Sequence, residues 1–179
     1  MLEEGEIAMR PLALCAGVSE ATPYNLFGIK RHLVAALYAQ DCDAFLVQLG
    51  ERTRGDALTR LFEALDLYCD NLAARPHYHR TLMAELYGPG RVQDAGGPDP
   101  GIAVWLALIG ALERDGLIDP AIPADRLTTA FVHLLSGAVL EWTRGLCTIE
   151  TLRNNLAFGL RLCLKGASSH TAAHHPLLA

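Results

Sequence analysis

The sequence predicts an all-α protein, in which a small N-terminal group of helices is followed by a larger helical body. Apolar residues recur at the i, i+3, i+4, i+7 spacing of a helix face in one segment after another. Glycine and proline residues, which stop helices, separate these segments. No segment has the strict apolar–polar alternation of a half-buried strand. With 179 residues, of which 51% are hydrophobic, the chain can form one domain or two small ones that share a core.

The first three helices are predicted from local signals. One helix is expected to end at Gly17, because glycine adopts the left-handed conformation without a Cβ clash. A second, short helix is expected to follow Ser19, whose side chain we predict to be its N-cap. A third, long helix is predicted from Lys30 to about Glu51, with no proline inside it.

Five more helices are predicted, over residues 56–74, 77–87, 102–115, 125–144 and 148–164. The helix over 102–115 is so apolar that we expect it to be buried nearly all round, with Ile102 and Leu106 in its core stripe. The Gly- and Pro-rich residues 91–101 are expected to form a mobile loop. The tail, residues 167–179, is small, polar and His-containing, and is expected to be disordered.

One stretch near the N-terminus has the spacing of a helix-turn-helix. Ala13 lies four residues before Gly17 and leaves room for the second helix to approach the first. The stretch then reads Gly17-Val18-Ser19-x-x-Thr22-x-Tyr24-x-x-Phe27-x-x-Lys30-x-x-Leu33. This pattern resembles the DNA-binding signature of the TetR-type family of bacterial transcriptional regulators. A helical hairpin in an unrelated domain would explain the glycine and the apolar residues, but not the Thr, Tyr and Lys together.

The resemblance implies that double-stranded DNA is a partner. In that family the Thr-x-Tyr helix enters the major groove, and the lysine begins the next helix near a phosphate. The DNA-binding residues implied here are Arg10, Ser19, Thr22, Tyr24, Asn25 and Lys30. The net charge of the chain is −5, but residues 9–40 carry three Lys or Arg against one Glu. We therefore expect specific DNA binding with few phosphate contacts.

The chain departs from the family pattern in three places. Pro23 stands where the resemblance expects an aliphatic residue, so apolar packing should be lost there. Ile29 stands where a capping Ser or Thr is usual. Residues 1–8 are too few and too acidic for the helix that the family carries before its helix-turn-helix. Residues 1–48 are therefore expected to be a DNA-binding domain that is incomplete at its N-terminus.

The resemblance also implies that residues 49–166 form a ligand-binding and dimerisation domain. In the family the last two long helices pair with their copies in a four-helix bundle, and here these would be 125–144 and 148–164. Each has two apolar rows, one of which is expected to face a partner. The expected interface residues are Phe131, Gly137, Ala138, Leu152, Leu156 and Leu160. A monomer in which both rows are internal remains the alternative.

A pocket for a small molecule among the middle helices is implied as well. Polar and aromatic side chains on otherwise apolar helices indicate a small apolar or aromatic effector. The expected pocket residues are Tyr68, Met83, Trp105, His133 and Trp142. Core packing or surface contact is the commoner role for any one of these residues taken alone.

Other classes of function have less support in the sequence. We find no nucleophile elbow and no phosphate-binding glycine loop, and we predict no catalytic residue and no cofactor. The histidines at 77, 79, 170, 174 and 175 lack the ligand number of a zinc site, and we predict no metal. Five widely spaced cysteines favour free thiols in a reducing cytoplasm. No apolar run reaches the ~18 residues of a membrane span, so no membrane partner is expected.

The expected function is therefore that of a repressor which binds a palindromic operator as a homodimer and responds to a ligand. The effector would change the angle of the long helix over 30–51, and with it the distance between the two DNA-binding heads. Two alternatives stay open. One is a helical ligand-binding or dimerisation protein that lacks competent DNA binding, and the other is a small all-α enzyme.

Overall fold

The computed structural model describes residues 8–52, 55–87 and 99–168, which form eight α-helices. In chain order these are α1 (Met9–Ala16), α2 (Ala21–Phe27), α3 (Lys30–Arg52), α4 (Ala57–Ala74), α5 (Pro76–Tyr87), α6 (Pro100–Arg114), α7 (Ala124–Thr143) and α8 (Ile149–Ala167). Over these residues there is no strand, and only an isolated bridge joins Ile118 to Ser168. The all-α prediction is thus confirmed. Residues 1–7, residues 91–98 of the expected loop and residues 169–179 of the expected tail lie outside the described residues, so the predictions for them are not tested.

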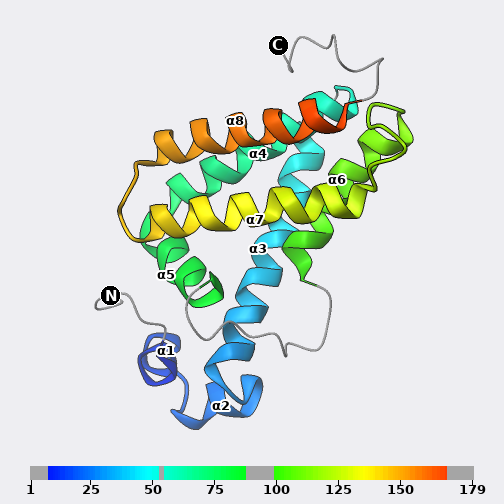
Figure 1. The fold of residues 1–179 in the computed structure, drawn as a ribbon. Helices are drawn as coiled ribbons and strands as arrows, with labels where there is room; N and C mark the ends of the chain where they lie inside the picture. The colour runs from blue at the N-terminus through cyan, green and yellow to red at the C-terminus, as the bar shows by residue number, and fades with distance from the viewer. Residues whose placement is uncertain (1–7, 53–54, 88–98, 169–179) are drawn as a thin grey trace.

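The helices divide into a small head and a larger body. The head consists of α1, α2 and the first turns of α3, and α3 continues from it into the body formed with α4 to α8 (Figure 1). In the body α7 and α8 lie side by side, α4 packs on α8, and α6 packs on α7 (Figure 1). Helix α3 therefore belongs to both parts.

Three helix starts follow from local capping. The side chains of Asp56, Asp99 and Thr148 each accept a hydrogen bond from a backbone N–H in the first turn of α4, α6 and α8. Such caps satisfy donors that a helix start leaves free, and each contributes about 1 kcal/mol. The boundaries of these helices are therefore set by residues next to them in the chain.

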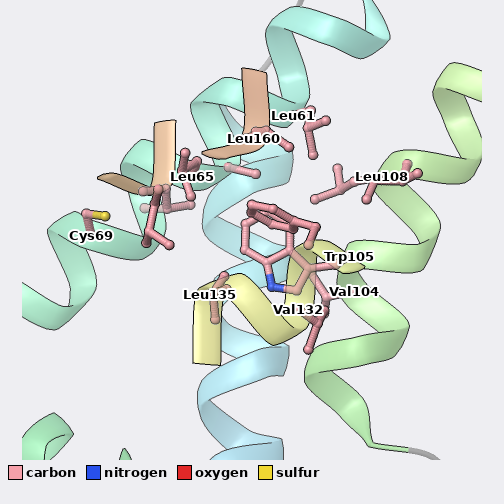
Figure 2. Packing of buried hydrophobic residues seen from close by; sticks show 14 of the residues in the cluster. Leu61, Leu65, Cys69, Val104, Trp105, Leu108, Val132, Leu135 and Leu160 are labelled. Atoms are coloured by element: carbon pink, nitrogen blue, oxygen red, sulfur yellow. The ribbon is translucent and has the colours of Figure 1, made fainter. Parts of the chain in front are cut away.

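The core of the body is built from apolar side chains of α4, α6, α7 and α8. Figure 2 shows Trp105 of α6 in the middle of a cluster with Leu61 and Leu65 of α4, Leu135 of α7 and Leu160 of α8. All of these side chains are buried. Full burial of a Leu side chain contributes roughly 1.5–3 kcal/mol, so this cluster is the main source of stability in the body.

Helix α6 is less deeply buried than its sequence predicts. Ile102 and Leu106, which we expected in its core stripe, are 37% and 39% exposed. Trp105, Ile109 and Leu112, the other expected members of the stripe, are buried, and Val104 and Leu108 are buried with them. The expectation of burial all round was wrong because α3, α4 and α7 cover only one side of this helix.

The C-terminal boundary of the body also differs from the prediction. Ala167, which we placed in the disordered tail, is the last residue of α8 and is buried. Its carbonyl accepts a hydrogen bond of 2.9 Å from the Asp119 N–H, and Ser168 pairs with Ile118. The connector between α6 and α7 thus holds the end of α8 in place.

Helices α7 and α8 approach closely at Gly159. A Cβ placed there would lie 2.5 Å from Cδ1 of Leu134, whereas a Cβ at Gly137 would meet nothing within 4 Å. Both glycines are inside helices, so an alanine brings the same gain in helix propensity at either site. We expect Gly159→Ala to be less stable than Gly137→Ala, by less than the roughly 1–3 kcal/mol usual for overpacking, because the half-buried Leu134 side chain can shift. Urea unfolding of the two variants measures this difference, and equal stabilities would contradict the close approach.

An ion-pair network fastens α8 and α3 to α4. The Arg153 guanidinium donates to Asp66 Oδ1 at 2.8 Å and to Asp70 Oδ1 at 2.7 Å. Arg52 of α3 donates to the other oxygen of Asp70 at 3.2 Å. The hydrogen bond from Arg153, and then that from Arg52, hold the pKa of Asp70 below its ordinary value. The ionised carboxylate is therefore the form that the folded protein favours.

This network predicts a pH dependence. Because the pKa of Asp70 is lowered on folding, its contribution is complete above its ordinary pKa of about 4 and is lost as the pH falls through the lowered value. We expect Arg153→Met to reduce the loss of stability on acidification relative to the parent protein. The effect should be small, because the groups are partly solvated and screened. Unfolding free energies measured across the acidic range test this, and identical pH profiles would contradict it.

Candidate functional site

The turn between α1 and α2 has the geometry of a helix-turn-helix. Gly17 adopts a left-handed conformation with φ of 66°. The N–H groups of Gly17 and Val18 donate to the carbonyls of Leu14 and Ala13, which closes the end of α1. Ala13 is buried, as expected for a small residue where two helices approach. The turn therefore forms as its sequence predicts.

The start of α2 differs from the prediction in two respects. The helix begins at Ala21 with Glu20 at its N-cap position, and no side chain caps it. The Ser19 hydroxyl is instead hydrogen-bonded to the Thr22 hydroxyl at 2.8 Å, so Ser19 is not the N-cap. Pro23, which we expected to weaken packing, is the buried residue of α2. The proline ring itself fills the inner face of α2. A proline is tolerated at this place because the first turn of a helix does not need its backbone N–H.

The expected DNA-binding residues do not form one free surface. Tyr24, which is 51% exposed, and Asn25 lie exposed on α2. Arg10 donates from Nε to Glu20 Oε2 at 2.9 Å, and both side chains are exposed. Lys30, at the start of α3, pairs through Nζ with Oε1 of Glu85 at 2.6 Å. Tyr24 and Asn25 are thus presented to solvent, whereas Arg10 and Lys30 are engaged with carboxylates.

The body contains a cavity of about 290 Å³ between α3, α4, α5 and α6. Its lining residues are Tyr38, Asp41, Cys42, Ala44, Phe45, Gln48, Tyr68, Asn71, Leu72, Ala74, Arg75, His79, Met83, Gly101, Val104 and Trp105. The volume is close to the lower end of the range of small-molecule sites, roughly 300–1,000 Å³. A cavity of this size and mixed lining can hold a small organic molecule.

The expected pocket residues divide between the cavity and other places. Tyr68, Met83 and Trp105 are in its wall. His133 is not in the lining and is exposed on α7. Trp142 is buried outside the lining, with the Arg80 guanidinium carbon 5.0 Å from its ring centre. These last two are therefore a surface and a packing residue, because α7 turns both away from the cavity.

No residue of α3 was expected in the pocket, yet this helix supplies part of the cavity wall. Tyr38, Asp41, Phe45 and Gln48 all line the cavity. Their spacing of three, four and three residues places them on one face of a helix. A search of α3 for a face that carries both polar and aromatic residues would have found them.

The polar groups of the cavity are gathered around Asp41. Its Oδ2 accepts a hydrogen bond of 2.9 Å from the Tyr78 hydroxyl, and its Oδ1 lies 3.4 Å from the Arg75 guanidinium. Nδ1 of His79 is 3.9 Å from Oδ2. Burial lowers the pKa of His79, against the opposing effect of the Asp41 charge. The imidazole is therefore neutral at pH 7, and the charge of Asp41 is balanced by Arg75.

Tyr38 shapes one end of the cavity. Its hydroxyl is hydrogen-bonded to the side chains of Cys42 and Tyr87, and burial raises its pKa. A Cβ at Gly101 would overlap this hydroxyl. Glycine at that position leaves room for the tip of the Tyr38 side chain against α6.

Four of the expected interface residues belong to the core of the protomer. Phe131, Leu152, Leu156 and Leu160 have no exposed surface. Periodicity defines apolar rows on each helix, but these four residues belong to rows that pack inside the protomer. Gly137 is exposed and Ala138 is half-buried, so these two remain available on α7. The large apolar side chains exposed on α8 are Phe158, at 63%, and Leu162, at 55%.

The described residues contain neither a membrane-spanning helix nor a group of metal ligands. None of the described helices is long and apolar enough to cross a bilayer. In the same part of the chain, no three His, Cys, Asp or Glu side chains gather where they could hold a metal ion.

Comparison with known proteins places the fold. No protein-family model and no curated protein matches the sequence. The structure is similar to that of a TetR transcriptional regulator from Rhodococcus sp. RHA1, with a TM-score of 0.68 and 20% identity over 88% of this chain and 84% of that chain. It is also similar to a protein with unknown function from Rhodococcus sp. RHA1, with a TM-score of 0.62 and 22% identity over 91% and 86% of the two chains. The chain therefore has a TetR-like fold.

Proposed function

We propose that this protein is a DNA-binding transcriptional regulator that responds to a small ligand. The observation that carries the proposal is the helix-turn-helix head, in which the Gly17 turn sets α2 against α1 and leaves Tyr24 and Asn25 exposed. A short exposed helix of this kind can enter the major groove and contact base edges. The TetR-like fold favours a regulator over an enzyme, since one protein of this fold is described as a transcriptional regulator.

Two helices connect the cavity to the head. Helix α3 begins at Lys30 in the head and lines the cavity with Asp41 and Phe45 further along. Helix α5 lines the cavity with His79 and reaches the head through the Lys30–Glu85 ion pair. A ligand that changes the spacing of α3 and α5 would therefore move the head. We propose that the ligand favours the arrangement that does not bind DNA, so that the protein represses when the ligand is absent.

A homodimer is the proposed active form. One α2 helix contacts only a few base pairs, whereas two heads related by a two-fold axis can read a palindrome. The exposed face of α7 and α8, with Gly137, Phe158 and Leu162, supplies apolar surface and a small residue for close approach. Gly137 was already among the expected interface residues, whereas Phe158 and Leu162 take the place of the four that are buried in the protomer.

The experiment that tests the proposal is a DNA-binding titration. The purified protein is mixed with labelled fragments that flank its own gene, at several salt concentrations and with unrelated DNA as competitor. Saturable, sequence-selective binding that weakens with salt is the expected result, because phosphate contacts release counterions. A folded dimer without selective binding would contradict the proposal.

One observation favours a second candidate, a ligand-binding protein of this fold without DNA binding. Two of the basic residues expected at phosphates, Arg10 and Lys30, are paired with Glu20 and Glu85. In complex with DNA these pairs would have to exchange a carboxylate for a phosphate. The same titration separates the candidates, because this second protein would bind no fragment at any salt concentration.

A further inference from the structure

The cavity wall contains a hydroxyl group that the protein leaves without a partner. The Tyr68 oxygen is buried and makes no hydrogen bond within the described residues. Burial raises the pKa of Tyr68 well above its ordinary value, so the group is a neutral O–H donor. A buried donor without an acceptor costs about 1–3 kcal/mol. Tyr68 belongs to the cavity wall, and its oxygen is covered in the empty cavity, so a rotation of the side chain would bring the hydroxyl to an acceptor on a bound molecule.

A second polar group in the wall has hydrogen-bonding capacity to spare. His79 is only 4% exposed, its polar neighbours are the Asn71 backbone and the Asp41 carboxylate, and neither ring nitrogen makes a hydrogen bond of good geometry. A neutral imidazole offers one N–H donor and one acceptor. Tyr38 differs from both, since its hydroxyl is already hydrogen-bonded to Cys42 and Tyr87. The unmet hydrogen-bonding capacity of the wall thus lies on Tyr68 and His79.

The charge of the wall selects against ions. Asp41 and Arg75 are the only charged residues in the described lining, and they pair with each other. Burial raises the pKa of Cys42 to about 12, so its thiol is neutral at pH 7. An anionic ligand would meet the Asp41 carboxylate without an unpaired cation to offset it, and burial of an unpaired charge is costly.

The apolar part of the wall is largely aromatic. The rings of Phe45 and Tyr68 lie 6.4 and 6.1 Å from that of Trp105, in tilted and edge-on arrangements. Aromatic ligands pack well against ring faces and edges of this kind. A water molecule occupies about 30 Å³ of liquid, so a cavity of about 290 Å³ has room for at least about ten non-hydrogen atoms.

We propose that the cavity binds a small, neutral aromatic molecule with a carbonyl-type hydrogen-bond acceptor, and that the Tyr68 hydroxyl donates to this acceptor. His79 provides the second polar contact. The inference rests on the proposed function insofar as the cavity is taken to be the ligand site. It adds the chemical class of the ligand and the residue that recognises it.

Three probes of nearly equal shape test the inference. Acetophenone carries the carbonyl acceptor, isopropylbenzene lacks it, and benzoate replaces it with a carboxylate. Their dissociation constants are measured by ligand-detected NMR with the full chain and with Tyr68→Phe. For each probe, the dissociation constant with Tyr68→Phe is divided by that with the parent protein. This ratio does not depend on how hydrophobic the probe is.

We expect Tyr68→Phe to weaken acetophenone binding by about three- to tenfold, the usual contribution of one net hydrogen bond. Isopropylbenzene should bind the variant as well as it binds the parent protein, or better, and benzoate should bind the parent more weakly than acetophenone. The variant should also be at least as stable thermally as the parent, because it loses an unpaired buried hydroxyl. A marked drop in its stability would assign the hydroxyl a structural role and overturn the inference.

The remaining outcomes separate this inference from the proposed function. If isopropylbenzene binds but Tyr68→Phe leaves acetophenone unchanged, the ligand site stands and the acceptor inference is wrong. If benzoate binds more tightly than acetophenone, the preference for a neutral ligand is wrong. If no probe binds saturably, both the ligand site and the inference fail, while the DNA-binding titration still tests the regulator assignment.

Discussion

Phe131→Ala is expected to lower the free energy of unfolding by about 3–5 kcal/mol, the usual cost of removing a buried aromatic ring. Phe131 has no exposed surface, and its ring centre lies 5.1 Å from that of Trp105 in an edge-on contact between α7 and α6. The alanine would leave a cavity beside Trp105 in the main cluster of the body. Urea unfolding followed by circular dichroism measures the loss.

A matched control distinguishes a core residue from an interface residue. Phe158 on the neighbouring helix α8 is 63% exposed, so Phe158→Ala should change the stability of the protomer by less than about 1 kcal/mol. The same change should weaken self-association if this face forms the dimer, which sedimentation at several protein concentrations detects. The opposite pattern, with a stable Phe131→Ala protein that no longer dimerises, would restore Phe131 to the interface.

Tyr24→Ala is expected to weaken operator binding by roughly 5- to 150-fold, the range for loss of a contact worth about 1–3 kcal/mol. Tyr24 is exposed on α2, so its removal should leave the fold unchanged. The measurement is a polarisation titration on the fragment selected by the DNA-binding experiment, together with a thermal unfolding curve. Unchanged affinity in a folded Tyr24→Ala protein would remove this residue from the DNA contacts.

Lys30 requires a pair of variants because two roles are open to it. A phosphate contact would make Lys30→Ala weaken binding to all sequences and reduce the salt dependence by about one counterion. Alternatively, the ion pair of 2.6 Å between Lys30 and Glu85 could hold the head in position against α5. Glu85→Gln removes that ion pair and keeps the lysine. If Lys30 contacts phosphate, Glu85→Gln should retain or strengthen DNA binding. If Lys30 only positions the head, both variants should weaken it alike.

Much of the local structure was predictable because it depends on neighbouring residues. The Gly17 turn, the starts of α4 and α8 next to Asp56 and Thr148, and the long α3 follow from conformational preferences and hydrogen bonds that span a few residues. The start of α2 escaped the prediction because Ser19 and Thr22 satisfy each other through their hydroxyls. When two residues with hydroxyl groups lie three positions apart, each hydroxyl can bond either to a backbone N–H or to the other hydroxyl.

The site was predictable only in part. Tyr68 and Trp105 were expected in the pocket and line the cavity, whereas His133 and Trp142 do not. Residue type indicates that a polar or aromatic group is unusual on an apolar helix, but it does not say which neighbour that group faces. Asp41 illustrates the same limit, since nothing in its local sequence reveals the contacts with Tyr78 and Arg75.

Residue order alone is enough to predict that this protein is helical, where most of its helices begin and end, and that a helix-turn-helix lies near its N-terminus. Those features arise from short-range sterics, capping and periodicity. The inward position of Phe131, the outward position of Phe158 and the cavity between four helices become visible only in the folded protein. Periodicity defines the faces of a helix, but the partner of each face depends on packing between segments that are distant in the chain.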